Sequence, residues 1–210
     1  MITEPDVTLT DYSLVIECAF LTYLLHRQGS LQRQLQTWFM LFFTSVGVGA
    51  LTGGTVHGFF LNETTTGYAV LWPATLLAIG VTALTMWTIG AKIYFSTTTA
   101  RWITIVAAVG FVGYGIVVLF VTQDFFVVIV NYLPAVSFLL LVFLSLYLRT
   151  RARLALVGLA GLALILIASW VQHSGIALHP IYFNHNAFYH LIQAVALFLI
   201  FWSTRWFLVA

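Results

Sequence analysis

The chain has 210 residues, of which 61% are hydrophobic and only 7% are charged, and its formal net charge is +2. Soluble domains carry about 25% charged residues, so this composition excludes a fold whose whole surface faces water. The few basic residues are scattered along the chain, which also argues against nucleic-acid binding. We therefore expect an integral membrane protein whose length suits a single domain over residues 1–210.

Seven apolar stretches are long enough to cross a bilayer, which takes about 20 residues of α-helix. In chain order, the predicted spans cover residues 11–27, 35–60, 67–92, 102–122, 125–148, 153–173 and 184–207. Short polar segments connect them. We predict an all-α bundle of seven transmembrane helices.

The basic residues predict how this bundle is oriented. Because successive spans run in opposite directions, all eight fall on one side: Arg27, Arg33, Lys92, Arg101, Arg149, Arg151, Arg153 and Arg205. Cytoplasmic loops carry the excess of Lys and Arg, so this side is predicted to face the cytoplasm. The N-terminus is then outside and the C-terminus is cytoplasmic. The compact loops favour the inner membrane of a bacterium.

Small residues and prolines mark special positions within the spans. Glycines allow transmembrane helices to approach closely, and a proline frees a backbone carbonyl and bends its helix. We expect close helix packing at Gly49, Gly53, Gly54, Gly110, Gly113, Gly158 and Gly161, and bends at Pro73 and Pro134.

Ionisable side chains gather at one depth of the predicted bundle. A charged residue at the centre of a membrane helix costs about 2.5–3.5 kcal/mol on insertion scales, so each one requires a reason. The topology places Glu17, His57 and His190 in the outer half of spans 1, 2 and 7. Polar residues in the same layer are Tyr68, Asn131, Gln172, His185 and Asn186. One polar pocket opening in the outer leaflet would explain them together.

Span 7 carries the most regular polar pattern. Asn186 and His190 are four residues apart and share a face with Gln193. His185 points roughly 140° away from His190 on a helix that turns about 100° per residue. Neutral imidazole is a common zinc ligand, and catalytic zinc usually has three protein ligands and a water. The pattern is consistent with zinc at His57 and His190, with Asn186 or His185 as a third ligand, or with a hydrogen-bond network that fixes helix register.

These features resemble the CREST superfamily, which includes the alkaline ceramidases and the adiponectin receptors. The segment Asn186-Ala-Phe-Tyr-His190 is similar to the family's span-7 motif of two histidines four apart, with Asn186 in place of the first. His57 resembles the zinc histidine of span 2, and Glu17 resembles the acidic residue of span 1. In ceramidases that residue belongs to a calcium site, which the resemblance extends here to Glu4, Asp6 and Asp11.

The resemblance implies zinc-dependent hydrolysis of an amide or ester in a membrane lipid. A metal-bound water would attack, with Glu17, His57 and His190 as the catalytic residues and Glu17 accepting the proton. Two departures leave enzyme activity open: the family's serine is Gly53 here, and the stretch around Tyr68 lacks the family's aspartate.

Two alternatives to a hydrolase follow from the same pocket. The first is a non-catalytic receptor or subunit of a membrane complex that binds a lipid or pigment. Asn186, Tyr68 and Gln193 would then contact the ligand. The second is a redox protein in which His57 and His190 are axial ligands of a haem.

Overall fold

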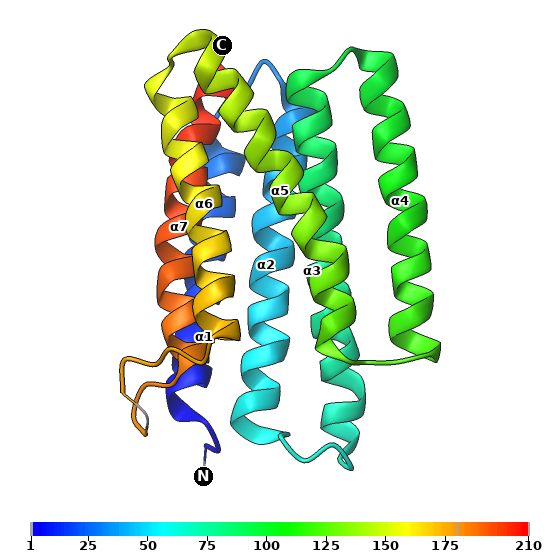
Figure 1. The fold of residues 1–210 in the computed structure, drawn as a ribbon, viewed down its shortest axis with the longest axis vertical. Coiled ribbons are helices and arrows are strands. Elements are labelled where there is room, and N and C mark those ends of the chain that lie inside the picture. The colour runs from blue at the N-terminus through cyan, green and yellow to red at the C-terminus, as the bar shows by residue number, and fades with distance from the viewer. Residues whose placement is uncertain (1, 180, 210) are drawn as a thin grey trace.

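The computed structural model describes residues 2–179 and 181–209, and these residues form seven helices (Figure 1). The helices are α1 (Pro5–Arg27), α2 (Arg33–Phe59), α3 (Thr66–Tyr94), α4 (Thr97–Phe120), α5 (Phe125–Thr150), α6 (Arg153–His173) and α7 (His185–Val209). Each is long and apolar enough to cross a membrane. For the described residues, the predicted all-α bundle is confirmed, with seven helices of the length and hydropathy that a membrane span needs.

The first helix begins earlier than predicted, at Pro5 rather than at residue 11. Proline is favoured at the first helical position because its fixed backbone angle suits the helix and its missing N–H would be unpaired there. Asp6 in the first turn is stabilised by the positive end of the helix dipole. Asp11 therefore lies within α1, about one and a half turns from its start.

Local chemistry also sets the starts of three other helices. The side chains of Thr65, Ser96 and Asp124 each accept a hydrogen bond from a backbone N–H group in the first turn of α3, α4 and α5. Such caps satisfy N–H groups that have no partner within the helix. The helices α3 and α5 continue through Pro73 and Pro134.

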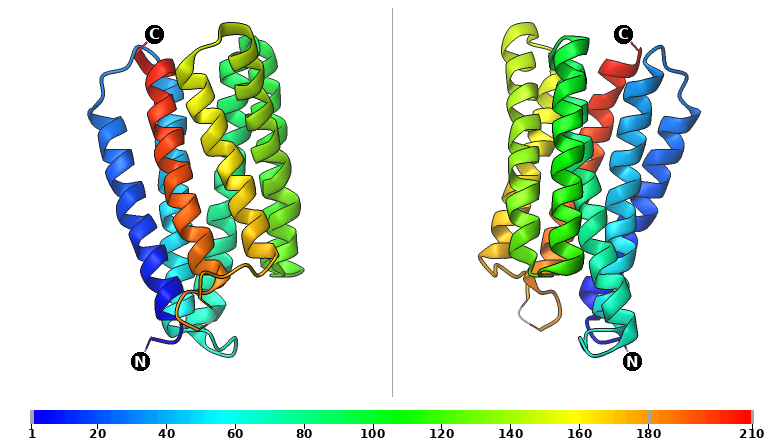
Figure 2. Two further views of the ribbon diagram at one scale, coloured as in Figure 1. Left: turned by 60° about the vertical axis from the view of Figure 1, so that its left-hand side comes forward. Right: turned by 90° about the vertical axis from the view of Figure 1, so that its right-hand side faces the viewer.

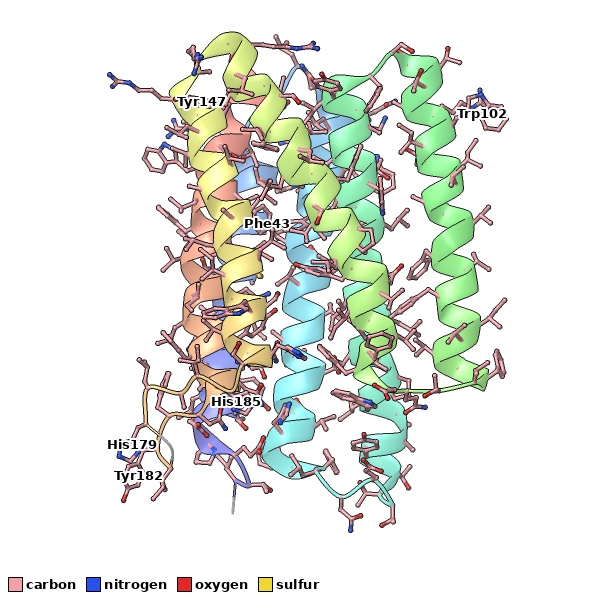
Figure 3. The ribbon with its side chains drawn as sticks, in the orientation of Figure 1. Phe43, Trp102, Tyr147, His179, Tyr182 and His185 are labelled. Carbon is pink, nitrogen blue, oxygen red and sulfur yellow. The ribbon has the colours of Figure 1, made fainter. Side chains whose placement is uncertain are left out.

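Six of the helices close into a ring, and the seventh lies outside it. Going around the ring, α1 packs on α2, α2 on α3, α3 on α5, α5 on α6, α6 on α7, and α7 on α1. The helix α4 packs chiefly on α3 and stands at the edge of the bundle (Figures 1 and 2). Trp102 of α4 points away from the ring (Figure 3). Only Ala100, Tyr114 and Val118 of this helix are buried.

The two ends of the bundle differ in charge, and the chain termini lie at opposite ends (Figure 2). We call the end where α1, α3, α5 and α7 begin the cavity end, for the cavity described below. At the other end, which we call the basic end, lie all eight Lys and Arg residues. This distribution follows the predicted topology, and the orientation in the membrane stays a prediction.

The tightest packing lies between the middle of the bundle and the basic end. Phe39, Phe42, Phe43 and Phe143 are fully buried there, within one cluster that includes side chains of α1, α2, α3, α5, α6 and α7. Phe43 lies near the middle of the ring (Figure 3). Large aromatic rings thus fill this half of the ring.

Glycines of α2 hold α1 and α2 in direct contact. A Cβ atom at Gly54 would lie 2.6 Å from the Cβ of Asp11, and one at Gly58 would lie 2.9 Å from the hydroxyl oxygen of Thr8. Neither separation is tolerated by real side chains, so only glycine permits this approach. Gly49 and Gly53 lie on another face of α2, which packs on α3.

The predicted role of the other glycines is confirmed in α6 and wrong in α4. A Cβ atom at Gly161 would lie 2.8 Å from the carbonyl oxygen of Ala196 in α7, so α6 and α7 are closely packed there. Around Gly110 and Gly113, in contrast, no heavy atom of a described residue lies within 4 Å of a Cβ position. Because α4 lies outside the ring, these two glycines have no helix to approach.

Candidate functional site

A cavity of about 810 Å³ lies between the helices in the half of the bundle toward the cavity end. Pockets for small molecules usually measure about 300–1,000 Å³. All six helices of the ring contribute to its wall, which is mostly apolar. Its polar lining residues are Asp11, His57, Thr75, Thr82, Tyr132, Ser169, Gln172, His173, Asn186, Tyr189, His190 and Gln193.

His57 contributes an imidazole from the last turn of α2. The backbone N–H of Thr3 donates to the carbonyl oxygen of Gly58, which brings the segment before α1 over the end of α2. Glu4 of this segment then accepts a hydrogen bond of 2.5 Å from Nδ1 of His57. With its proton on Nδ1, a neutral imidazole has a lone pair on Nε2. No described residue bonds to this Nε2, so it is available to a molecule in the cavity.

His190 is held by two neighbouring residues of α1. The hydroxyl of Thr10 lies 2.9 Å from the carbonyl oxygens of Asp6 and Val7, so it donates its one proton to the backbone. The same oxygen lies 3.0 Å from Nδ1 of His190 and, with its proton on the backbone, is placed to accept from that nitrogen. Nε2 of His190 then faces Oδ1 of Asp11 at 3.3 Å.

This arrangement favours a proton shared within the His190–Asp11 pair. A neutral imidazole with its proton on Nδ1 has a lone pair on Nε2, and a carboxylate oxygen is also an acceptor. Two acceptors 3.3 Å apart repel each other unless one of them carries a proton. Asp11 is 5% exposed and His190 is 9% exposed, so water does little to relieve the repulsion. The pair is therefore suited to store and release one proton.

Asn186 lies one turn before His190 and also lines the cavity. Its side-chain oxygen accepts a hydrogen bond of 3.0 Å from Nε2 of Gln172 in α6. The start of α7 is fixed by Asn184, whose side chain accepts from the backbone N–H groups of Asn186 and Ala187. Its own N–H donates to Asp6 of α1 at 2.9 Å. The amide NH₂ group of Asn186 has no partner among the residues that the structure describes.

Four of the residues predicted for the site line the cavity, namely His57, His190, Asn186 and Gln193. The sequence predicted that Glu17 would join the two histidines, but Glu17 does not line the cavity. It lies six residues beyond Asp11 on α1, or about 9 Å along the helix axis. Asp11 provides the carboxylate instead.

Two further predicted residues also lie away from the cavity. Tyr68 is in the first turn of α3, where its ring stacks on Trp72 with centroids 5.9 Å apart and its hydroxyl donates to Glu63. His185 is the first residue of α7, at the loop that carries His179 and Tyr182 (Figure 3). A ligand within the cavity would contact neither residue.

The sequence contains a signal for Asp11 in the proline at position 5. A first span that begins at residue 11 leaves Asp11 at the edge of an acidic N-terminal segment, away from the predicted pocket. With α1 beginning at Pro5, Asp11 and His190 each lie near the beginning of a helix that starts at the same end of the bundle. The shared depth of the two residues was therefore readable from the sequence, but their contact was not.

The His, Cys, Asp and Glu side chains of the described residues do not gather around a common point. Among the described residues, no three His, Cys, Asp or Glu side chains lie close enough together to hold a metal ion. The carboxylates of Glu4, Asp6 and Asp11 have three separate partners, which argues against a shared calcium ion. An axial haem ligand needs a free ring nitrogen, and Nε2 of His190 already faces Asp11. Zinc, calcium and haem therefore stay predictions, and the described residues do not provide a set of ligands for any of them.

Comparison with known proteins places the chain in a family. No curated protein and no solved structure is detectably similar to the chain. A model of a family of unknown function, DUF6962, matches residues 7–208. This range includes Asp11, His57 and His190, and the resemblance to the CREST superfamily stays a prediction. Because the match covers nearly the whole sequence, the chain belongs to the DUF6962 family.

Proposed function

We propose that the protein hydrolyses an amide or ester bond of a membrane lipid, using its own side chains as acid and base. The observation that carries the proposal is one mostly apolar cavity lined by Asp11, His57 and His190, which come from three different helices. Burying an ionisable group in such surroundings costs free energy, so three of them in one cavity favour a functional site. The apolar wall suits a lipid chain, and the polar groups suit the bond to be cleaved.

His57 is the general base in this proposal. Its Nε2 takes a proton from a water molecule, and the resulting hydroxide bonds to the carbonyl carbon of the lipid. Glu4 holds Nδ1–H of the same ring, which orients the imidazole and stabilises its positive charge after proton transfer. A carboxylate that positions a histidine in this way is a recurring feature of hydrolytic sites.

The His190–Asp11 pair is the general acid. It gives its proton to the leaving nitrogen or oxygen as the C–N or C–O bond breaks, and the products are a carboxylic acid and an amine or alcohol. The proton taken up by His57 then restores the pair. The free NH₂ group of Asn186 is suited to donate a hydrogen bond to the carbonyl oxygen as it becomes negative. Two groups held in different environments thus divide the acid and base roles.

The location of the reaction follows from the charge distribution. Positive residues favour the cytoplasmic side, and the cavity is at the opposite end of the bundle. We therefore place the site in the outer leaflet, with a bacterial inner membrane as the proposed location. In this interpretation the protein is a divergent relative of the CREST hydrolases that uses paired side chains where those enzymes use zinc.

A lipid hydrolysis assay tests the proposal. Purified protein in detergent would be incubated with a ceramide, a phospholipid and a lysophospholipid, and the released fatty acid measured. We expect release from at least one lipid, and a loss of about 10²–10⁴-fold in His57→Gln because general base catalysis contributes that much. His185→Gln is the matched control, since His185 does not line the cavity.

Two results of this assay would contradict the proposal. One is the absence of fatty acid release from every lipid tested, and the other is a His57→Gln variant as active as the wild type. A metal chelator provides a further distinction. Activity that survives the chelator supports side-chain catalysis, whereas activity that is lost and then restored by zinc supports a metal-dependent hydrolase instead.

A second function, lipid binding without catalysis, is favoured by a different observation. Among the residues that the structure describes, no serine or threonine hydroxyl bonds to His57 or His173. The hydroxyl that lies against His190, that of Thr10, is also 2.9 Å from two backbone carbonyl oxygens. The wall also carries aromatic rings suited to a bound chain, including Trp72, Phe125 and Trp170. Mass spectrometry that finds one lipid per protein, together with no turnover, would support this function.

A further inference from the structure

We infer that the lipid reaches the cavity sideways from the bilayer, through an opening between α5 and α6. The residues on its two sides are Phe126, Ile129 and Leu133 of α5 and Trp170 of α6, and we call this feature the α5–α6 opening. All four line the cavity, and all four side chains are more than a third exposed. Phe126 is 65% exposed and Trp170 is 61% exposed. The choice of a lipid as the occupant rests on the proposed function.

The depth of the opening indicates that it faces hydrocarbon. Leu133 is 46% exposed, yet it lies eight residues after Phe125, where α5 begins. At 1.5 Å per residue this corresponds to about 12 Å along the helix, within a hydrocarbon core about 30 Å thick. An opening confined to the end of the bundle would expose only residues in the first turn of α5.

The neighbouring helix contacts around the ring are closed, which makes the α5–α6 opening distinctive. In the cavity half, the α1–α2 contact is closed where Gly54 meets Asp11, and α6 and α7 are joined where Nε2 of Gln172 donates to the side-chain oxygen of Asn186. Between α3 and α5, the indole N–H of Trp72 donates to the carbonyl oxygen of Gln123 at 3.1 Å. The ring of Trp72 also lies 6.3 Å from that of Phe125.

Toward the basic end, α5 and α6 are in direct contact. There Gly158 of α6 lies directly under the ring of Phe143. In the cavity half, no hydrogen bond or ring pair joins the two helices among the described residues. Figure 1 shows α5 leaning away from α6 as the two helices run toward the cavity end. One pair of neighbouring helices is thus closed at one end and separated at the other.

The chemistry of the opening selects the occupant. Its four residues are aromatic or aliphatic, so a charged or strongly hydrated molecule would lose its water there without a replacement. An alkyl chain forms no hydrogen bonds with water, so it can lie in the opening without this cost. We therefore assign the substrate to the membrane-resident amphiphiles, with the chain between α5 and α6 and the cleavable bond beside Asp11, His57 and His190.

Labelling of a cysteine inside the cavity tests the route. Ser169 lines the cavity from α6, and its hydroxyl donates only to the carbonyl oxygen of Ile165, so Ser169→Cys should preserve the fold. Cys18, the single native cysteine, is buried and makes the wild type a suitable background. The variant in vesicles would be treated with a long-chain alkyl maleimide, and separately with a water-soluble, positively charged methanethiosulfonate.

The rate of each reagent with Ser169→Cys would first be divided by its rate with a free thiol in solution. We expect this relative rate to be at least about tenfold higher for the alkyl maleimide than for the charged reagent, because a charge is costly in hydrocarbon. Two exposed positions calibrate the rates: Ser13→Cys on the outside of α1 for the lipid route, and Thr64→Cys in the α2–α3 loop for the water route. A reaction pattern like that of Thr64→Cys would overturn the lateral route. So would a cysteine that reacts with neither reagent.

The labelling result is independent of catalysis, which separates the two proposals. If the alkyl maleimide labels the cysteine but the protein hydrolyses no lipid, the result supports the α5–α6 opening and contradicts the proposed hydrolase. Water-side labelling of an active hydrolase would contradict the opening and retain the hydrolase. As a direct check, widening of the opening by Trp170→Ala should speed the labelling of Ser169→Cys by the alkyl maleimide, whereas Trp202→Ala on α7 should leave it unchanged.

Discussion

The two halves of the bundle use the same six helices in opposite ways. Toward the basic end, fully buried rings such as Phe39, Phe43 and Phe143 fill the space between the helices. Toward the cavity end, the same ring of helices surrounds about 810 Å³ of cavity lined by Asp11, His57 and His190. The comparison indicates that one half keeps the ring assembled, so that the other half can remain open around polar groups.

The physical basis of this difference is the membrane itself. Lipid chains are as apolar as leucine side chains, so helices in a bilayer associate through close packing and hydrogen bonds rather than through the hydrophobic effect. The filled half provides close packing. The cavity half provides the hydrogen bonds between Glu4 and His57 and between Thr10 and His190. Substitutions in each half can test this division of roles, and the largest effect is expected in the filled half.

Removal of a central ring should have the largest effect on stability. Phe43 is 0% exposed, and Phe→Ala substitutions in packed cores cost about 3–5 kcal/mol. We expect Phe43→Ala to lower the free energy of unfolding by about that amount, as measured by denaturation in mixed detergent micelles. Phe126→Ala in the cavity half is the matched control and should cost less than about 1 kcal/mol. Equal losses in the two variants would contradict the comparison.

The glycine contact between α1 and α2 should have the next largest effect. Gly54→Ala places a methyl group against Asp11, and overpacking of this kind costs about 1–3 kcal/mol. Gly113→Ala on α4 meets no neighbour and should be neutral or stabilising by up to about 1 kcal/mol, because alanine is the better helix former. Thermal unfolding in detergent would compare the two variants. A Gly113→Ala variant less stable than Gly54→Ala would indicate that α4 packs on another helix.

Removal of the Thr10 hydroxyl should have a moderate effect on stability and on the protonation of His190. Thr10→Val keeps the shape of the side chain but removes the acceptor for Nδ1–H of His190, at a cost of about 1 kcal/mol. Nitrogen NMR of labelled histidine should then show that His190 no longer keeps its proton on Nδ1 alone. Thr10→Ser retains the hydroxyl and should preserve the wild-type signal. An unchanged spectrum in Thr10→Val would show that Thr10 does not fix the tautomer.

The smallest effect is expected at Glu17. This residue is half-buried and does not line the cavity. Glu17→Gln should therefore change stability by no more than about 0.5 kcal/mol and leave lipid hydrolysis at the wild-type level. Asp11→Asn, measured in the same assay, should remove most of the activity because the proton-sharing pair is broken. A large loss of lipid hydrolysis in Glu17→Gln, with Asp11→Asn still active, would support the original prediction that Glu17 is a catalytic residue.

Much of the bundle was determined by the sequence alone. The seven spans, the gathering of all basic residues at one end and the similar depth of His57 and His190 follow from hydropathy and charge. These properties belong to short segments, and the bilayer acts on each segment separately, so no knowledge of neighbouring helices is needed.

Only the tertiary structure decided which residues meet. The packing of α1 against α7 placed Asp11 rather than Glu17 beside His190, and the position of α4 outside the ring left Gly113 without a close neighbour among the described residues. The sequences of α5 and α6 also contain no pattern that predicts the separation of these two helices. Rotation, neighbour choice and tilt depend on how all the helix surfaces fit together, and this is a property of the whole bundle rather than of any one span.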